Sequence, residues 1–250
     1  MRLVTSALVV GTLAPDFEYF LQLMPRGGFG HTLPGVFVLD LPLALLVLWM
    51  FQGYLKVPLT LLLPDGFQRR VAPYLGEFRF FGWRRFALIV ASILLGVATH
   101  LVWDSFTHPG MGLYQHWHFL SRTVQLPLVG TVQYCKVFQH ASTVFGIGVL
   151  VVWFACWYRV TAPCNEARSG RLTTAQRARV IFFVAAIAVL GGLLHPILSI
   201  GLPTGVAAIQ RFTGQAVATA IALVWWQLVA FGFFTTRRMR RESEPSPRTG

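Results

Sequence analysis

The chain has 250 residues, of which only 12% are charged, and its mean hydropathy is +0.59. Soluble domains carry about 25% charged residues, so this composition predicts an integral membrane protein and excludes a soluble globular domain. The formal net charge of +12 does not indicate a nucleic-acid partner, because the basic residues flank long apolar runs instead of forming a groove interleaved with aromatic side chains.

Six apolar segments are each long enough to span a bilayer, since about 20 helical residues cross ~30 Å of hydrocarbon. We expect transmembrane helices at about 3–23, 35–55, 86–104, 142–160, 180–200 and 213–234. No small-x-small cleavage site follows the first segment, so we interpret it as a span, weakened by Pro15, Asp16 and Glu18. The predicted fold is an all-α membrane helix bundle, with one domain over 1–236 and a disordered basic tail over 237–250.

Lysine and arginine are distributed unevenly among the predicted loops. They gather in the 56–85 loop, the 161–179 loop and the C-terminal tail. All but four of the 21 lie on this side of the spans, the exceptions being Arg26, Arg122, Lys136 and Arg211. Because cytoplasmic loops carry the excess of basic residues, we expect a multi-pass protein of the cell membrane with both termini in the cytoplasm.

The histidines show the opposite distribution. All seven fall on the outer side of this topology: His31, His100, His108, His116, His118, His140 and His195. Four carboxylates fall there too: Asp16, Glu18, Asp40 and Asp104. Imidazoles and carboxylates are ligands of divalent metals, and ionisable groups close to hydrocarbon are costly and usually functional. The sequence therefore predicts a divalent-metal site on the extracytoplasmic side, with zinc as the expected ion.

The densest group of these residues lies at the outer end of the third predicted span. His100, Asp104 and His108 follow one another at intervals of four residues. A helix stacks such residues on one face, so we expect all three to be metal ligands. Asp104 is also the candidate catalytic residue, as a ligand or as the general base of a hydrolytic reaction.

Two further candidate ligands come from the first and second predicted spans. Asp16 and Glu18 are two residues apart and point in different directions on a helix, so we expect Asp16 to join the site. A glycine-rich turn over 27–30 presents His31 at the start of the second span. Glu18 and Asp40 are interpreted either as ligands or as helix-capping and hydrogen-bonding residues.

The remaining histidines are less clearly placed. His140 opens the fourth span and is expected to point back into the cluster as a ligand. His116 and His118 flank Trp117, so they either coordinate metal or belong to an interfacial polar belt. His195 lies within the fifth span, where a lone histidine is often a packing or hydrogen-bonding residue, and its role stays open.

These motifs, in their order along the chain, resemble a bacterial family of integral membrane proteins, the domain-of-unknown-function family 4184. The likeness covers about residues 5–235 and rests on Ala14-Pro15-Asp16-Phe17-Glu18-Tyr19, Gly30-His31-Thr32, His100-x3-Asp104-Ser105-Phe106-Thr107-His108 and Gln139-His140-x-Ser142. More distantly, the motifs are similar to the membrane-bound metal-dependent hydrolase family. By that resemblance Asp16, His31, His100 and Asp104 match its metal motif. The family pattern usually includes a histidine before the first span, whereas Met1 here stands almost at the span.

Two functional expectations follow. One is a metal-dependent hydrolase of the bacterial inner membrane that acts at the outer face on a lipid or a lipid-linked phosphoester, with membrane lipids as its partners. The sequence contains no G-x-S-x-G, H-E-x-x-H or P-loop motif, so only the location suggests this substrate. The other is a non-enzymatic membrane protein that handles metal or protons or supports the envelope. No feature of the sequence predicts an oligomeric state.

Overall fold

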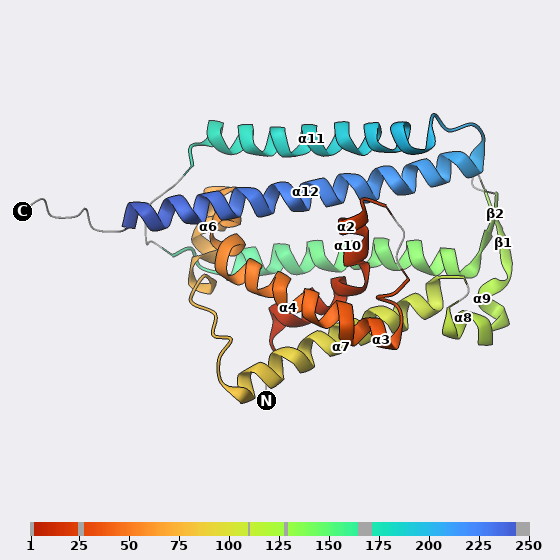
Figure 1. Ribbon diagram of the computed structural model, residues 1–250, viewed down its shortest axis with the longest axis horizontal. Helices are drawn as coiled ribbons and strands as arrows, with labels where there is room; N and C mark the ends of the chain where they lie inside the picture. The colour runs from red at the N-terminus through yellow and green to blue at the C-terminus, as the bar shows by residue number, and fades with distance from the viewer. Residues whose placement is uncertain (1–2, 25–27, 110, 128–129, 165–171, 244–250) are drawn as a thin grey trace, which may run out of the picture.

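The computed structural model describes residues 3–24, 28–109, 111–127, 130–164 and 172–243. In this part of the chain, five helical segments are long and apolar enough to cross a membrane: Leu33–Leu61, Trp83–His116, Tyr134–Val160, Thr174–Ile200 and Val206–Glu242. By length and composition these five helices are candidate spans of a multi-pass membrane protein, and the predicted all-α class is confirmed. The three long C-terminal helices run nearly parallel along the length of the molecule (Figure 1).

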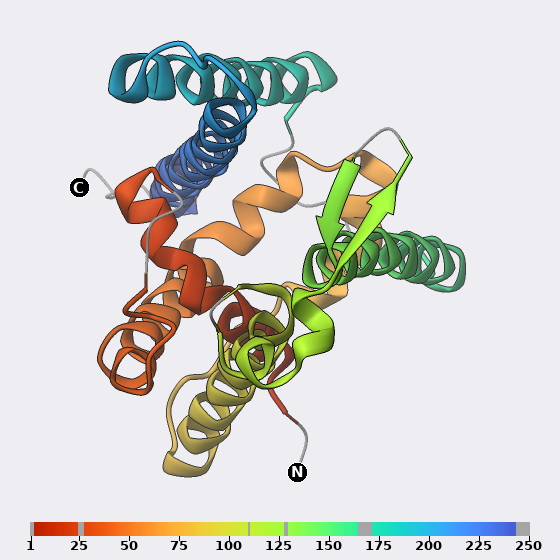
Figure 2. The same ribbon diagram turned by 90° about the vertical axis from the view of Figure 1, so that its right-hand side faces the viewer.

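The first predicted span is not one of these five helices. The segment is divided into α1 (Thr5–Leu13), a 3-10 turn η1 (Ala14–Asp16) and α2 (Phe17–Gln22). Pro15 has no N–H to continue the α-helical ladder, and its ring clashes with the preceding turn. The prediction of one continuous helix over 3–23 is therefore wrong, and α2 runs across the long helices instead of along them (Figures 1 and 2).

The second span is a continuous helix that changes its winding twice. It consists of α3 (Leu33–Gly35), a π turn η2 (Val36–Asp40), α4 (Leu41–Met50), a second π turn η3 (Phe51–Leu55) and α5 (Lys56–Leu61). Because Pro42 cannot donate a backbone hydrogen bond, the turn before it winds in the wider π form. Such π turns are frequent at functional sites. This first π turn ends at Asp40, which is fully buried.

Helix α7 (Trp83–Thr107) is the structural centre of the N-terminal half. It packs against α1 with the two backbones in direct contact, because a Cβ atom on Gly11 would lie 2.2 Å from the Ile93 carbonyl oxygen and one on Gly96 would lie 2.3 Å from that of Leu8. Small residues allow this close approach between membrane helices. The buried apolar core lies around α1, α4 and α7 and includes Ile93.

The connection after α7 contains regular structure that the sequence did not predict. Two short helices, α8 (Gly112–His116) and α9 (His118–Ser121), precede the strands β1 (Thr123–Leu126) and β2 (Gly130–Gln133). The strands form an antiparallel hairpin in which Thr123 pairs with Gln133. The hairpin leads directly into α10 (Tyr134–Val160), which stands at the edge of the molecule (Figure 2).

The last two helices form a tightly packed hairpin. Helix α11 (Thr174–Ile200) begins with a capping box between Thr173 and Gln176. Its Gly192 meets α12 (Val206–Ser243), where an added Cβ would lie 2.9 Å from the Ala216 carbonyl oxygen. Helix α12 continues to Ser243, so residues 237–243 of the expected tail are helical; the rest of the tail lies outside the described residues.

The basic end of the molecule is tied together by arginine contacts. Two short elements, α6 (Asp65–Val71) and the 3-10 turn η4 (Ala72–Tyr74), follow α5. Arg70 of α6 donates to the Tyr158 carbonyl and stacks 3.9 Å above its ring, which connects α6 to α10. Arg177 of α11 pairs with Asp65. These contacts hold α10 and α11 against the 56–85 segment.

Candidate metal centre

Four of the predicted site residues meet at one point between the first segment, the turn before α3 and the end of α7. The closest approaches involve Asp104 Oδ2, which lies 3.2 Å from His31 Nε2 and 3.2 Å from His100 Nε2. Asp16 Oδ1 lies 3.9 Å from His31 Nε2 and 3.8 Å from His100 Nε2. The predicted convergence of these side chains, which are separated by up to 88 positions, is confirmed.

The orientation of His100 is set by a backbone group of α1. His100 Nδ1 lies 2.8 Å from the Thr12 carbonyl oxygen, which can only accept a hydrogen bond. Nδ1 therefore carries the proton, and in a neutral imidazole Nε2 is left with a lone pair. Nε2, the nitrogen that a metal would bind, faces the carboxylates, 3.2 Å from Asp104 Oδ2 and 3.8 Å from Asp16 Oδ1. A histidine held by a backbone carbonyl with its other nitrogen free is the usual arrangement of a metal ligand.

His31 is positioned by a local turn and by the start of the second span. Thr32 caps α3, since its hydroxyl accepts a hydrogen bond from the Gly35 N–H at 3.1 Å and donates to the Phe29 carbonyl at 2.7 Å. The imidazole of His31 is only 5% exposed. Its ring centre lies 5.5 Å from that of His100, with the rings edge to face. Both Nε2 atoms thus face Asp104.

Asp104 is held from its other side by His108. The two residues are one helical turn apart, and His108 Nδ1 lies 3.4 Å from Asp104 Oδ1. Helix α7 ends here, with His108 in an extended conformation before Pro109, as expected for a residue that precedes proline. His108 therefore contacts Asp104. Among the described residues, no hydrogen bond links it to the imidazoles of His31 and His100.

Asp16 supplies the accessible side of the cluster. It ends the 3-10 turn η1, and its side chain is 39% exposed, whereas that of Asp104 is 15% exposed. The turn at Pro15 directs Asp16 toward the imidazoles and leaves Glu18 on the buried side of α2, as expected for residues two apart. Asp16, His31 and His100 each offer one ligand atom within 4.8 Å of the others, an arrangement that could hold a metal ion.

Two more carboxyl groups border the cluster without hydrogen-bond partners. Both carboxyl oxygens of Asp40, and Oε2 of Glu18, are buried and unpartnered in the described part of the chain. Asp40 does not cap α4 through its side chain. Its Oδ1 lies beside the turn that carries His31, because a Cβ added to Gly30 would be 2.8 Å from it. The helix-capping interpretation of Asp40 is therefore not supported.

The other histidines lie apart from these contacts. His140 is exposed on α10 and, among the described residues, makes no hydrogen bond or ion pair with the cluster, so its assignment as a ligand stays a prediction. His116 donates from Nδ1 to the Gly112 carbonyl of its own helix, and His118 begins α9; both side chains are exposed. His195 lies 3.0 Å from the Thr219 hydroxyl, which supports its interpretation as a hydrogen-bonding residue.

One functional group of the site could not be recognised as such in the sequence. The Thr12 carbonyl orients His100, but a backbone group carries no residue-type signal. The available signal is indirect: Gly11 and Gly96 face each other where α1 and α7 touch, and this contact brings Thr12 within hydrogen-bond distance of His100.

Comparisons with known proteins give a family and nothing more specific. No curated protein matches the chain, and no solved structure matches it. No comparison supports the more distant resemblance to membrane-bound metal-dependent hydrolases. A family model described as "Domain of unknown function (DUF4184)" matches residues 1–233. The chain therefore belongs to the DUF4184 family.

Proposed function

We propose that this protein binds a divalent metal ion, best fitted by zinc, at the outer face of the cell membrane and uses it to hydrolyse a lipid or lipid-linked phosphoester. One observation carries the metal site. All five buried side-chain nitrogen and oxygen atoms that lack a hydrogen-bond partner in the described residues belong to Glu18, His31, Asp40 and His100. Buried polar groups are otherwise paired. A cation bound at His100 Nε2 would satisfy the one of these atoms that belongs to the proposed ligand set, and its positive charge would offset the negative charge of Asp40, whose Oδ1 lies beside the turn that carries His31.

The spacing of the ligand atoms fits such an ion. Two atoms bound at about 2.0–2.2 Å to one tetrahedral ion lie about 3.3–3.6 Å apart. Asp104 Oδ2 lies 3.2 Å from both imidazole nitrogens, and Asp16 Oδ1 lies 3.8 and 3.9 Å from them. Two imidazoles with carboxylates are a frequent zinc ligand set. We therefore assign His31, His100 and Asp104 as the inner ligands and Asp16 as the ligand on the accessible side.

The charge of the bordering carboxyl groups also favours a cation. A buried carboxylate without a partner costs several kcal/mol, and Asp40, whose two carboxyl oxygens are unpartnered among the described residues, lies beside the turn that carries His31. A divalent ion bound between the imidazoles of His31 and His100 would offset this negative charge. His108 would act by holding Asp104 through Oδ1, in the manner of the outer-shell groups that orient metal ligands.

The basic loops and the direction of α1 support the proposed outward-facing location. Helix α1 runs parallel to α7, with the Val4 N–H bonded to Ser92 and the Thr12 carbonyl bonded to His100. Since the arginine-rich 56–85 segment precedes α7, the cluster belongs to the outer end of that helix. The broken α1–α2 segment is not one of the five long helices; if it nevertheless counts as a sixth passage, the number is even and both termini lie in the cytoplasm, with the cluster facing outward.

Hydrolysis would depend on the chain's own ligands and on the opening at Asp16. A bound zinc supplies Lewis-acid activation of water and of a phosphoryl oxygen. Asp104 binds that ion and stands beside both imidazoles, so it is the residue on which activity depends most directly. Asp16, which is 39% exposed, and His108, also 39% exposed, leave the site open toward the headgroup level.

A second candidate function is favoured by the number of ligands. If Asp16 and Asp104 both bind together with His31 and His100, four protein atoms fill a tetrahedral site, which is the pattern of structural zinc sites. The protein would then be a non-enzymatic membrane protein in which the metal fixes the outer ends of α1, α3 and α7. We favour the hydrolase because Asp16 is exposed. A ligand at the water boundary can leave one coordination position of the metal open.

The experiment compares hydrolysis by zinc-loaded protein, chelated protein and two variants, with phosphatidylglycerol in vesicles and a chromogenic phosphodiester as substrates. Zinc-loaded wild type should release product, and chelated protein and His100→Ala should not. His116→Ala is the matched control, because His116 is exposed and bonds only within its own helix. Zinc bound at one equivalent with no hydrolysis of either substrate would discard the enzyme and leave the structural alternative.

A further inference from the structure

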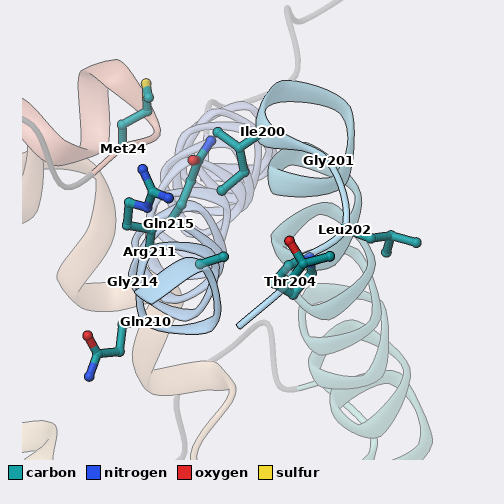
Figure 3. Close-up of a pocket in the computed structure, with 11 residues that line it drawn as sticks. Met24, Ile200, Gly201, Leu202, Thr204, Gln210, Arg211, Gly214 and Gln215 are labelled. Atoms are coloured by element: carbon teal, nitrogen blue, oxygen red, sulfur yellow. The ribbon is translucent and has the colours of Figure 1, made fainter. Parts of the chain in front are cut away.

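A cavity of about 600 Å³ lies at the junction between α11 and α12, apart from the metal centre. Its walls are the connection over 200–204, the first turns of α12 and Met24 from the segment after α2 (Figure 3). None of the four clustered residues lines it. The junction lies at the same end of the molecule as the β1–β2 hairpin (Figure 1), which the basic-loop distribution assigns to the outer side of the membrane.

The charge of the cavity is positive and is not offset by the protein. Arg211 is the one ionisable residue in its lining, and no aspartate or glutamate lines it. Within the described ranges the Arg211 guanidinium makes no hydrogen bond and no ion pair, and the side chain is exposed. The N-terminus of α12, a helix of 38 residues, adds the positive end of its dipole at the same place. An anion is the ligand that this arrangement favours.

The part of the wall beside Arg211 is built from buried, hydrogen-bonded groups. Gln215, one turn beyond Arg211, is only 4% exposed, and its amide donates to the Ser199 hydroxyl at 2.6 Å. Behind it, His195 lies 3.0 Å from the Thr219 hydroxyl, which donates to the Leu23 carbonyl at 2.8 Å. This chain of bonds joins α11, α12 and the segment after α2. It fixes the walls before a ligand binds, which lowers the entropic cost of binding.

We propose that this cavity binds a phosphate group. The Arg211 guanidinium is matched to phosphate because it can donate two parallel hydrogen bonds, and Thr204 offers a hydroxyl from the facing loop (Figure 3). Apolar side chains such as Met24 and Leu202 line the same cavity and would contact a glycerol backbone or acyl chain. The phosphate belongs either to a lipid headgroup or to a free phosphomonoester, since both carry the same chemistry.

The test uses delipidated full-length protein in a maltoside detergent, which contains no phosphate. Three probes are titrated and binding is followed by calorimetry: glycerol 3-phosphate, dioctanoyl phosphatidylglycerol, and dioctanoylglycerol, which lacks the phosphate. The phospholipid should bind saturably, and dioctanoylglycerol should bind at least about tenfold more weakly, because a charge-assisted hydrogen bond is lost. Binding of glycerol 3-phosphate as well would identify the free group as sufficient, and its failure would identify a lipid ligand.

Two variants locate the site. Arg211→Gln should weaken phospholipid binding at least about tenfold, and Ala208→Trp should do so by filling the cavity without changing its charge. Arg122→Gln is the matched control, since Arg122 is exposed and does not line the cavity. Equal affinities for the phospholipid and dioctanoylglycerol, or equal affinities of Arg211→Gln and Arg122→Gln, would overturn the proposal. Thermal unfolding of each variant verifies that it is folded.

Discussion

Replacing Gly96 by alanine tests whether the contact between α1 and α7 positions the metal centre. The added Cβ would lie 2.3 Å from the Leu8 carbonyl oxygen and 2.7 Å from the Thr12 backbone nitrogen, whereas ordinary contacts begin at 3.4 Å. Helix α1 must therefore move away by about 1 Å. Overpacking of this kind destabilises a protein by about 1–3 kcal/mol.

The same displacement should weaken metal binding. The hydrogen bond from His100 Nδ1 to the Thr12 carbonyl is 2.8 Å long, and a shift of about 1 Å would take it beyond the range of a hydrogen bond. Loss of such an orienting partner typically lowers metal affinity by about 10- to 100-fold. We expect a lower midpoint of thermal unfolding and a zinc affinity reduced by this factor in a competition titration with a fluorescent chelator.

The control for this substitution is Gly146→Ala on α10, where an added Cβ meets nothing within 4 Å. This change should leave zinc affinity unaltered and should raise helix stability slightly, because alanine is the better helix former. If Gly96→Ala behaves like Gly146→Ala in both assays, the contact between α1 and α7 does not position His100, and the account of its orientation is refuted.

Three further predictions address topology and ligand roles. Reporter fusions after residues 70, 120 and 170 should report cytoplasmic, external and cytoplasmic locations; a cytoplasmic signal at 120 would place the cluster on the wrong side. Zinc content should fall as the pH decreases through the range in which imidazole is protonated, because imidazolium cannot coordinate; a constant content down to pH 4 would exclude histidine ligands. His108→Ala should lower zinc affinity by about tenfold without abolishing binding, since His108 contacts the carboxylate Asp104; complete loss would make it a ligand.

The class of the protein and the composition of the site could be predicted from residue types and spacing. A low charge content and long apolar runs are sufficient to identify membrane helices. The i, i+4 spacing of His100 and Asp104 places them on one face of α7, and the boundary between span and loop places Asp16 and His31 at the same level. These inferences depend only on helix periodicity and hydrophobicity, which are local properties.

Other features depend on tertiary contacts and could not be predicted in this way. Pro15 was visible as a weakness in the first span, but its effect, a 3-10 turn that aims Asp16 at two imidazoles, depends on the packing of α1 against α7. The Thr12 carbonyl and the hydrogen bond of His195 to Thr219 join residues 88 and 24 positions apart. The strands in the 105–141 connection have only four residues each, the shortest length at which an alternation of apolar and polar residues indicates a strand.

The central claim is that His31, His100, Asp104 and Asp16 hold one divalent ion, and metal analysis of purified variants tests it most directly. Wild type should contain about one zinc per chain, removable by chelation and restored by added zinc. His100→Ala and Asp104→Ala should each empty the site, and the double variant should lose no more, because ligands of one ion act as a unit. All three should stay folded, since apolar packing holds the helices. Full zinc occupancy in both single variants would contradict the account.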